Sequence, residues 1–154
     1  MLTRCRRGVV MSDREDLLRS LTDRSELTDL VARHSVWLDE ARYDESDRLF
    51  TTDVVVRSPR GTATGLDGLV ALARAGHDAY SRRMHSKSNL VVDVDGDTAT
   101  VRAHDLAVFV IDDESEAIAA AVHRYGARRT ESGWRFTSLD ITPIALTAPL
   151  ARVL

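Results

Sequence analysis

The sequence predicts an α+β domain, with helices in its first half and a meander of long antiparallel strands in its second. Apolar residues recur every three or four positions up to about residue 80, which is typical of helices, and then alternate with a period of two, which is typical of strands. The dipeptide Asp95-Gly96 between two alternating segments is a strong hairpin signal. With 154 residues, 44% of them hydrophobic, the chain is long enough to bury one core.

Helical patterns occupy most of the first half. Residues 12–20 are expected to form a short helix, because Ser12 can cap it and Glu15 suits the positive end of its dipole. A longer helix starts at Thr22 or Asp23 and presents one apolar stripe. The stripe consists of Leu27, Leu30, Val31, His34, Leu38 and Ala41. The next expected elements are a short helix over 44–50, a strand over 54–56, a loop over 60–65 and a helix over 66–80.

Four long strands are expected after Ser81. Several of them carry apolar residues on both faces, as Ala107 and Val108 show for one strand. Pro143 places the last strand at a sheet edge or at a bulge. The helices can cover one face of such a sheet, so we expect a homodimer in which a second copy covers the outer face. The expected strands are 85–94, 98–111, 117–129 and 134–146.

The composition excludes several classes of protein. The net charge of −3 argues against nucleic-acid binding, and no apolar run approaches the ~20 residues needed to cross a bilayer. The single cysteine, Cys5, cannot form an internal disulfide and lacks the spacing of zinc ligands. We therefore expect a cytoplasmic protein without a nucleic-acid or membrane partner.

Three segments are expected along the chain: a disordered N-terminal extension over 1–11, the domain over 12–147 and a C-terminal tail over 148–154. The extension contains arginines but no apolar segment of the kind found in secretory signals. Met11 is then a candidate for the natural start. The alternative is that these residues form a basic arm that contacts an anionic partner.

Two stretches carry a family resemblance. LTDLVARHSVWLDEARYDESDRLFTTDVVVRSP (27–59) has a helix with an Asp near its end, an aromatic residue, a short helix ending in Leu-Phe and a valine-rich strand. MHSKSNLVVDVDGDTATVRAHDLAV (84–108) has a His, an Asn four residues later and Asp-Gly-Asp-Thr-Ala at the hairpin. This arrangement resembles the SnoaL-like family of the nuclear-transport-factor-2-like superfamily. The resemblance implies a cystatin-like α+β barrel, in which a curved antiparallel sheet forms a cone and about three helices close a central pocket.

Four histidines lie on faces that are otherwise apolar. His85 and Asn89 are four residues apart on one expected strand, so they share a face. His104 and His123 lie on apolar strand faces, and His34 lies on the apolar stripe of the long helix. A hydrophobic cavity with a few polar groups is the usual form of a small-molecule site. We therefore expect a small hydrophobic molecule as the partner of this pocket.

Within the superfamily, the pocket is most similar to that of scytalone dehydratase. Asp39 falls where that enzyme has its pocket Asp, and His85 falls where it has its first pocket His. Its second His falls nearer Val110, and its pocket Asn falls near His123. The resemblance implies a related pocket with Asp39 and His85 as the catalytic pair. The substrate-binding candidates are His34, Trp37, Tyr43, Asn89, His104 and His123.

A His–Asp pair can perform acid–base chemistry without a cofactor. Neutral histidine can take a proton from a carbon next to a carbonyl group, and a carboxylate on its other ring nitrogen fixes the tautomer. A second histidine or an asparagine could then stabilise the developing oxyanion. We therefore predict a cofactor-independent lyase or isomerase that dehydrates, isomerises or cyclises a small apolar carbonyl compound.

Other interpretations stay open. The same cone could hold a hydrophobic ligand without converting it, or could serve dimerisation alone. Asp39 could be an ordinary acidic residue near a helix end, and the histidines, Trp37 and Tyr43 could be core residues. His77 is expected to be structural. Several histidines in one cavity could also hold a metal, but no His-x-His or His-x-x-x-His spacing occurs, so we expect no metal site.

Overall fold

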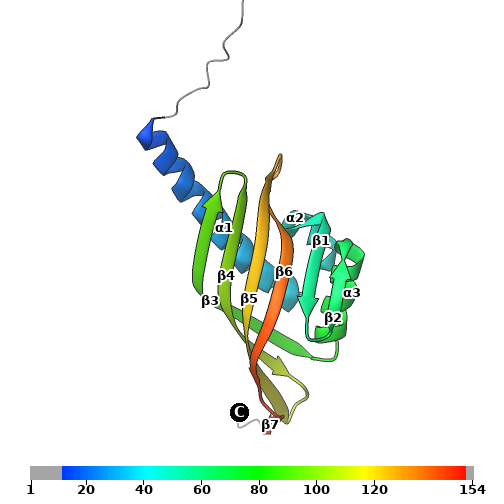
Figure 1. Ribbon diagram of the computed structural model, residues 1–154. Helices are drawn as coiled ribbons and strands as arrows, with labels where there is room; N and C mark the ends of the chain where they lie inside the picture. Colours follow the sequence, from blue (N-terminus) through cyan, green and yellow to red (C-terminus); the bar gives the residue numbers. More distant parts are fainter. Residues whose placement is uncertain (1–11, 152–154) are drawn as a thin grey trace, which may run out of the picture.

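A computed structural model describes residues 12–151, so the predicted extension over 1–11 lies outside the described part of the chain. The predicted α+β order of elements is confirmed, with helices first and the long strands after them (Figure 1). In chain order the elements are α1 (Asp13–Asp39), the 3-10 helix η1 (Tyr43–Glu45), α2 (Ser46–Leu49), β1 (Phe50–Ser58), β2 (Gly61–Thr64), α3 (Gly65–His77), β3 (Arg82–Asp95), β4 (Thr98–Val110), β5 (Ser115–Thr130), β6 (Gly133–Leu146) and β7 (Leu150–Ala151).

The strands form one sheet in the order β2-β1-β6-β5-β4-β3, and β7 pairs with β5. Strands β3 to β6 form the predicted antiparallel meander. Strand β1, however, runs parallel to β6, so the sheet is mixed rather than wholly antiparallel. Figure 1 shows the long strands bending along their length, with α1 lying across one face of the sheet and α3 beside β1 and β2.

Helix α1 is one continuous element where the sequence pattern predicts two helices. Ser12 caps it in a reciprocal capping box, in which the Ser12 hydroxyl accepts from the Glu15 amide and the Glu15 carboxylate accepts from the Ser12 amide. Residues 13–39 contain no Gly or Pro that would interrupt the helix. The predicted break was wrong because Asp23 does not cap a new helix; its buried carboxylate instead binds Arg129 of β5.

The C-terminal end of α1 places Asp39 against the sheet. Ala41 has φ 52, a left-handed conformation that ends the helix, and the Arg42 amide donates to the Trp37 carbonyl at 3.0 Å across the turn. Helix α1 contacts β3 directly, and the buried part of the helix includes Leu27, Val31 and Trp37. Asp39 is therefore the last helical residue, next to the strand that carries His85.

The segment predicted as a loop over 60–65 contains strand β2. This strand pairs with β1 in a tight hairpin, and Gly61 (φ 135) and Gly65 (φ 80) at its two ends adopt left-handed conformations that favour glycine. Helix α3 follows β2 without a linker and contacts β1. The predicted loop was wrong because the hairpin is formed by pairing with β1, which the short segment does not signal by itself.

Two irregularities change which side chains face inward. The β3–β4 pairing has a bulge between Ser88 and Val91, where Asn89 has φ 52. The β5–β6 pairing shifts register between Ala120 and Ala121, and Pro143 is the partner of Ala121, as the predicted bulge at this proline requires. Part of the predicted tail also belongs to the sheet, since Leu150–Ala151 pairs with β5.

The outer face of the sheet keeps exposed apolar side chains. No helix within residues 12–151 is both long enough and apolar enough to cross a membrane. The predicted homodimer through this face remains a prediction. The exposed side chains include Met84, Val91, Leu106 and Ile144.

Candidate functional site

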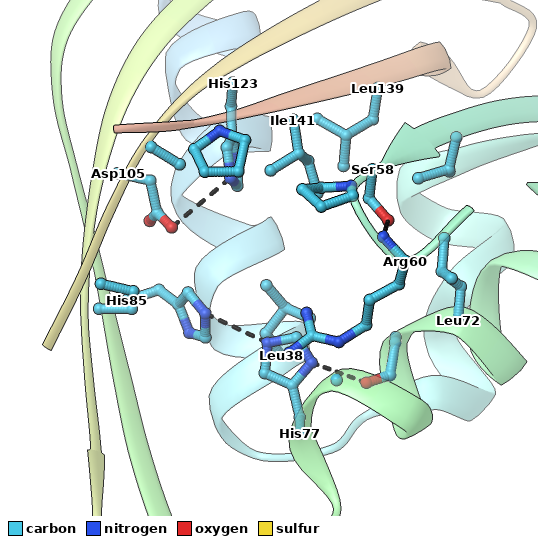
Figure 2. A pocket seen from close by; sticks show the side chains of 18 of the residues that line it. Leu38, Ser58, Arg60, Leu72, His77, His85, Asp105, His123, Leu139 and Ile141 are labelled. Carbon is cyan, nitrogen blue, oxygen red and sulfur yellow. Dashed lines mark hydrogen bonds and ion pairs between the residues drawn. The ribbon is translucent and has the colours of Figure 1, made fainter. Parts of the chain in front are cut away.

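A cavity of about 390 Å³ lies between the concave face of the sheet and helices α1 and α3 (Figure 2). Most of its wall is apolar, formed by alanines of β5 and by leucine, valine and phenylalanine side chains of the surrounding elements. The exposed lining residues mark where it reaches the surface: Pro59, Arg60, Pro143, Ala145 and Leu146. The polar lining residues are Ser58, Arg60, Tyr80, Asp105 and the histidines His34, His77, His85 and His123.

Asp39 and His85 form a hydrogen-bonded pair at the cavity wall. The His85 ring nitrogen Nδ1 lies 2.7 Å from Asp39 Oδ1, and the His85 backbone amide donates to Asp39 Oδ2 at 3.0 Å. Both carboxylate oxygens are thus engaged, and a carboxylate only accepts, so we assign the ring proton to Nδ1. The other ring nitrogen, Nε2, is the atom that can take up or release a proton.

His77 of α3 contacts that second nitrogen of His85. Its Nδ1 lies 2.7 Å from the Ala73 carbonyl oxygen, which only accepts, so His77 also carries its proton on Nδ1. The two Nε2 atoms lie 3.3 Å apart. With both rings neutral, two lone pairs face one another; a hydrogen bond forms when one ring gains a second proton. His85, which has the carboxylate partner, is the better host for that proton.

The pKa of His77 agrees with this assignment. Burial lowers it from 6.5 to about 4, and the bond to the Ala73 carbonyl opposes this shift. The charge that His85 carries when it is protonated, and the charges of Arg83 and Arg60, lower the pKa of His77 further. His77 is therefore neutral near pH 7 and offers its Nε2 lone pair to His85. The pair can hold one proton at the cavity wall.

Arg83 fixes the positions of both partners of His85. Its Nε donates to the Leu38 carbonyl at 2.7 Å, and its Nη1 donates to the His77 carbonyl at 3.2 Å. These carbonyls belong to the last turns of α1 and α3, where a helix has unpaired acceptors and a negative dipole end. One guanidinium thus holds together the two helix ends that carry Asp39 and His77.

A second polar cluster lies on the sheet side of the cavity. Asp105 of β4 is buried, its Oδ1 lies 2.5 Å from Lys87 Nζ, and its Oδ2 lies 3.5 Å from His123 Nε2. The other ring nitrogen of His123 contacts the Tyr125 hydroxyl at 3.2 Å, and this hydroxyl lies 3.0 Å from His34 Nδ1. Lys87, Asp105, His123, Tyr125 and His34 therefore form one continuous buried chain.

Burial determines the charge states in this chain. It lowers the pKa of His34 and of His123 well below the usual value, and the positive charge of Lys87 adds to both shifts. Burial also lowers the pKa of Lys87, although the charge of Asp105 opposes this. Both histidines are thus neutral near pH 7, and the Lys87 charge is balanced by Asp105.

The structure brings together part of the predicted site. His34, Trp37, His85 and His123 line the cavity, and Asp39 lies behind His85 as its hydrogen-bond partner.

Three predicted substrate-binding residues lie elsewhere. Asn89 and His104 hydrogen-bond to each other at 3.1 Å outside the cavity, because the bulge at Asn89 reverses the alternation of β3 and because the opposite face of β4 turns inward. Tyr43 is buried against Trp37 with ring centroids 5.0 Å apart and does not line the cavity.

Sequence reasoning missed four residues of the site. His77 was assigned a structural role, and Asp105, Lys87 and Arg60 were not singled out. The signal for Asp105 and Lys87 was the placement of two charged residues inside expected apolar strands, where an unpaired charge would be costly. The sequence carries no comparable signal for Arg60, which lies in a hairpin. Within residues 12–151, no group of three or more His, Cys, Asp or Glu is arranged to hold a metal.

Many solved structures share this fold. Kfla4162 protein from Kribbella flavida is 26% identical with a TM-score of 0.75, over 83% of this chain and 95% of that one. A Novosphingobium aromaticivorans protein assigned as a scytalone dehydratase is 21% identical, TM-score 0.75, covering 83% and 88%. A hexachlorocyclohexane dehydrochlorinase, LinA type 2, is 22% identical, TM-score 0.78, covering 88% and 94%.

The family is shown by the sequence itself. Among curated proteins, no sequence matches the chain. The profile of the SnoaL-like domain matches residues 19–140, which span α1 to most of β6 and include Asp39, His77, His85, Asp105 and His123. The solved structures share the fold over 83% and 88% of this chain. The chain belongs to the SnoaL-like domain family of the nuclear-transport-factor-2-like superfamily.

Proposed function

We propose that the cavity is an acid–base active site, in which His85 and Asp39 catalyse a cofactor-independent lyase or isomerase reaction on a small apolar compound. The observation that carries the proposal is the Asp39–His85 pair, with His85 Nδ1 at 2.7 Å from the carboxylate and its ring lining an apolar cavity. A histidine oriented in this way is ready to exchange a proton at Nε2.

In the proposed reaction, neutral His85 takes a proton from a substrate carbon. The C–H bond breaks, an N–H bond forms at Nε2, and the electron pair moves to a neighbouring carbonyl oxygen or expels a leaving group from the next carbon. Asp39 stabilises the imidazolium of His85. The new Nε2–H of His85 can then donate to His77 Nε2. His77 then acts as a positioning residue for the protonated state.

The sheet side of the cavity can assist this step. Asp105 and His123 face the same cavity and are linked by hydrogen bonds to groups that hold their orientation. Preorganised polar groups of this kind stabilise charge that develops during a reaction. Two structural neighbours are named as a dehydratase and a dehydrochlorinase, and both names denote elimination reactions. The fold that they share with this chain supports the proposal by analogy alone.

A second candidate is a non-catalytic binding protein for a hydrophobic ligand. The observation in its favour is the contact between His85 Nε2 and His77 Nε2 at 3.3 Å, which occupies the nitrogen that the enzyme would use. In that case the histidines would hold the helices against the sheet and the apolar wall would bind the ligand.

Proton exchange distinguishes the two candidates before a substrate is known. Aromatic and terpenoid carbonyl compounds with a β-hydroxyl or β-halide would be incubated with the protein in D2O, and carbon-bound deuterium and elimination products measured by NMR. We expect His85→Gln to lower the rate by about 10²–10⁴-fold. The matched control is His104→Gln, because His104 lies outside the cavity. Unchanged exchange in the His85 variant would reject the proposed base.

A further inference from the structure

The charge pattern of the cavity leaves one group uncompensated. Apart from the histidines, the charged residues that line the cavity are Arg60 and Asp105. Asp105 is balanced by Lys87, and Asp39 is held by His85. The Arg60 guanidinium, in contrast, has no acidic partner within residues 12–151. The cavity therefore carries one cation that nothing in the described chain neutralises.

Arg60 is placed toward the reacting end of the cavity. Its backbone amide donates to the Ser58 hydroxyl at 3.2 Å in the β1–β2 hairpin, which holds the base of the side chain. Figure 2 shows the side chain extending from this hairpin into the cavity toward His77. The charge of Arg60 also contributes to the lowered pKa of His77, after the larger effect of burial. A group bound by Arg60 would therefore lie close to the His77–His85 pair.

Helix α3 leaves room for this guanidinium at Gly76. A Cβ atom added at Gly76 would lie 3.3 Å from Arg60 Nη1 and 3.5 Å from its Cζ. Gly76 is a buried residue in the last turn of the helix, where its φ does not require glycine. Because Gly76 has no side chain, the guanidinium can pack directly against the helix backbone at this position.

From this arrangement we infer that the pocket takes an apolar compound that bears a carboxylate, and that Arg60 binds the carboxylate. That the bound compound reacts at His85 rests on the proposed function, whereas the binding of its carboxylate by Arg60 does not. Arg60 is exposed, so water solvates its charge while the cavity is open. A neutral apolar occupant would remove that water without replacing it. A carboxylate supplies a compensating charge and can accept two parallel hydrogen bonds from the guanidinium.

The rest of the cavity agrees with such a ligand. The alanines of β5 together with Leu69, Leu72 and Phe109 suit an apolar body rather than a second polar group. His34 and His123 are neutral because burial lowers the pKa of each, so they do not attract the anion away from Arg60. The bound carboxylate would sit at the mouth, with the apolar body pointing inward past His85.

The test compares two probes of the same shape by isothermal titration calorimetry. Naphthalene-2-carboxylate carries the charge and naphthalene-2-carboxamide does not. We expect wild-type protein to prefer the carboxylate, and Arg60→Gln to lower carboxylate affinity by about tenfold or more while the carboxamide changes less than about twofold. Arg60→Lys should restore part of the preference, since it keeps the charge but not the planar fork.

The matched control is Arg57→Gln. Arg57 lies in strand β1 of the same hairpin but forms an exposed ion pair with Asp140, so its loss changes the net charge equally without changing the cavity wall. Equal affinities of the two probes for wild-type protein, or an equal loss in the Arg57 and Arg60 variants, would overturn the inference. A retained preference in a protein that shows no proton exchange would reject the proposed function alone.

Discussion

Helix α1 presents two carboxylates to the sheet, and their partners differ. Asp23 accepts from Arg129 Nη2, which lies 2.8 Å from each carboxylate oxygen, and from Trp134 Nε1 at 3.2 Å. Asp39 accepts from the ring and the backbone amide of His85. The guanidinium of Arg129 stays charged at every physiological pH, and hydrogen bonds to Asp23 raise its pKa further. His85, in contrast, can gain and lose a proton.

The surroundings of the two clusters differ in the same way. Arg129 also binds Asp97 at 2.9 Å and lies over the Trp134 ring, with its Cζ 4.6 Å from the ring centroid. None of these residues lines the cavity, whereas His85 does. A carboxylate at this interface therefore stabilises the fold when its partner is a permanently charged guanidinium, and it can support chemistry when its partner is an imidazole beside an open space.

The largest expected effect is on the rate of proton exchange, which should depend on Asp39 and not on Asp23. Asp39→Asn should lower proton exchange by at least about 100-fold, because the amide cannot stabilise the His85 imidazolium as a carboxylate does. Asp23→Asn should leave the exchange rate per folded molecule unchanged. Rates are measured by NMR in D2O on protein whose folded fraction is checked by circular dichroism. Equal rates in the two variants would show that Asp39 has no special role.

The free energy of unfolding, in contrast, should depend more on Asp23 than on Asp39. Asp23→Ala should lower the free energy of unfolding by about 2–3 kcal/mol, because it leaves Arg129 Nη2 and the buried Trp134 indole without their acceptor. Asp39→Asn should cost only about 1 kcal/mol, since the asparagine oxygen can still accept from the His85 amide. Urea titration gives both values. A larger loss at Asp39 than at Asp23 would reverse the distinction.

A smaller effect should appear with pH. The pKa of His77 is near 6.5 in the unfolded chain and about 4 in the folded one, so the stability that its neutral state provides is present above pH 6.5 and is lost as the pH falls toward 4. Lowering the pH from 7 to 5 should cost about 2 kcal/mol through His77. The lowered pKa values of buried His34 and His123 act in the same direction.

Urea titrations at pH 7 and pH 5 measure this loss. In His77→Gln the loss should be smaller by about 2 kcal/mol, because glutamine does not titrate. The matched variant His104→Gln should behave as wild type, since His104 is only half-buried and hydrogen-bonds to Asn89 outside the cavity. If all three proteins lose the same stability between the two pH values, the buried neutral state of His77 makes no contribution.

Much of the fold followed from local pattern. The alternation after Ser81 located the four long strands to within a few residues, and Pro143 indicated the bulge at which it lies. The single helix α1, the hairpin of β2 and the short strand β7 did not follow from it. Helix α1 and strand β7 depend on partners far along the chain, such as Arg129 for Asp23 of α1, and β2 depends on its pairing with strand β1. Patterns of apolar spacing describe one segment at a time and contain no information about such partners.

The same limit applied to the site. The family resemblance of the two stretches placed Asp39 and His85 together, and the structure agrees. His104 lies outside the cavity, and Asp105 and Ala107 face it instead. Alternation could not show which face of β4 turns inward, because both faces are apolar. Asn89 was misplaced because its left-handed conformation inserts a bulge, and asparagine adopts that conformation without a distinctive sequence signal.

The amino-acid sequence by itself determined the α+β class, the order of helices and long strands, and the residue types available for acid–base chemistry. These properties depend on composition and on the spacing of apolar residues within each segment, both of which can be read without knowing the tertiary contacts. The tertiary contacts determine that His77 meets His85, that Lys87 balances Asp105 and that Arg60 has no acidic partner among residues 12–151. Charge pairing and cavity shape arise where distant segments meet, and the sheet curvature and its bulges determine which side chains those are.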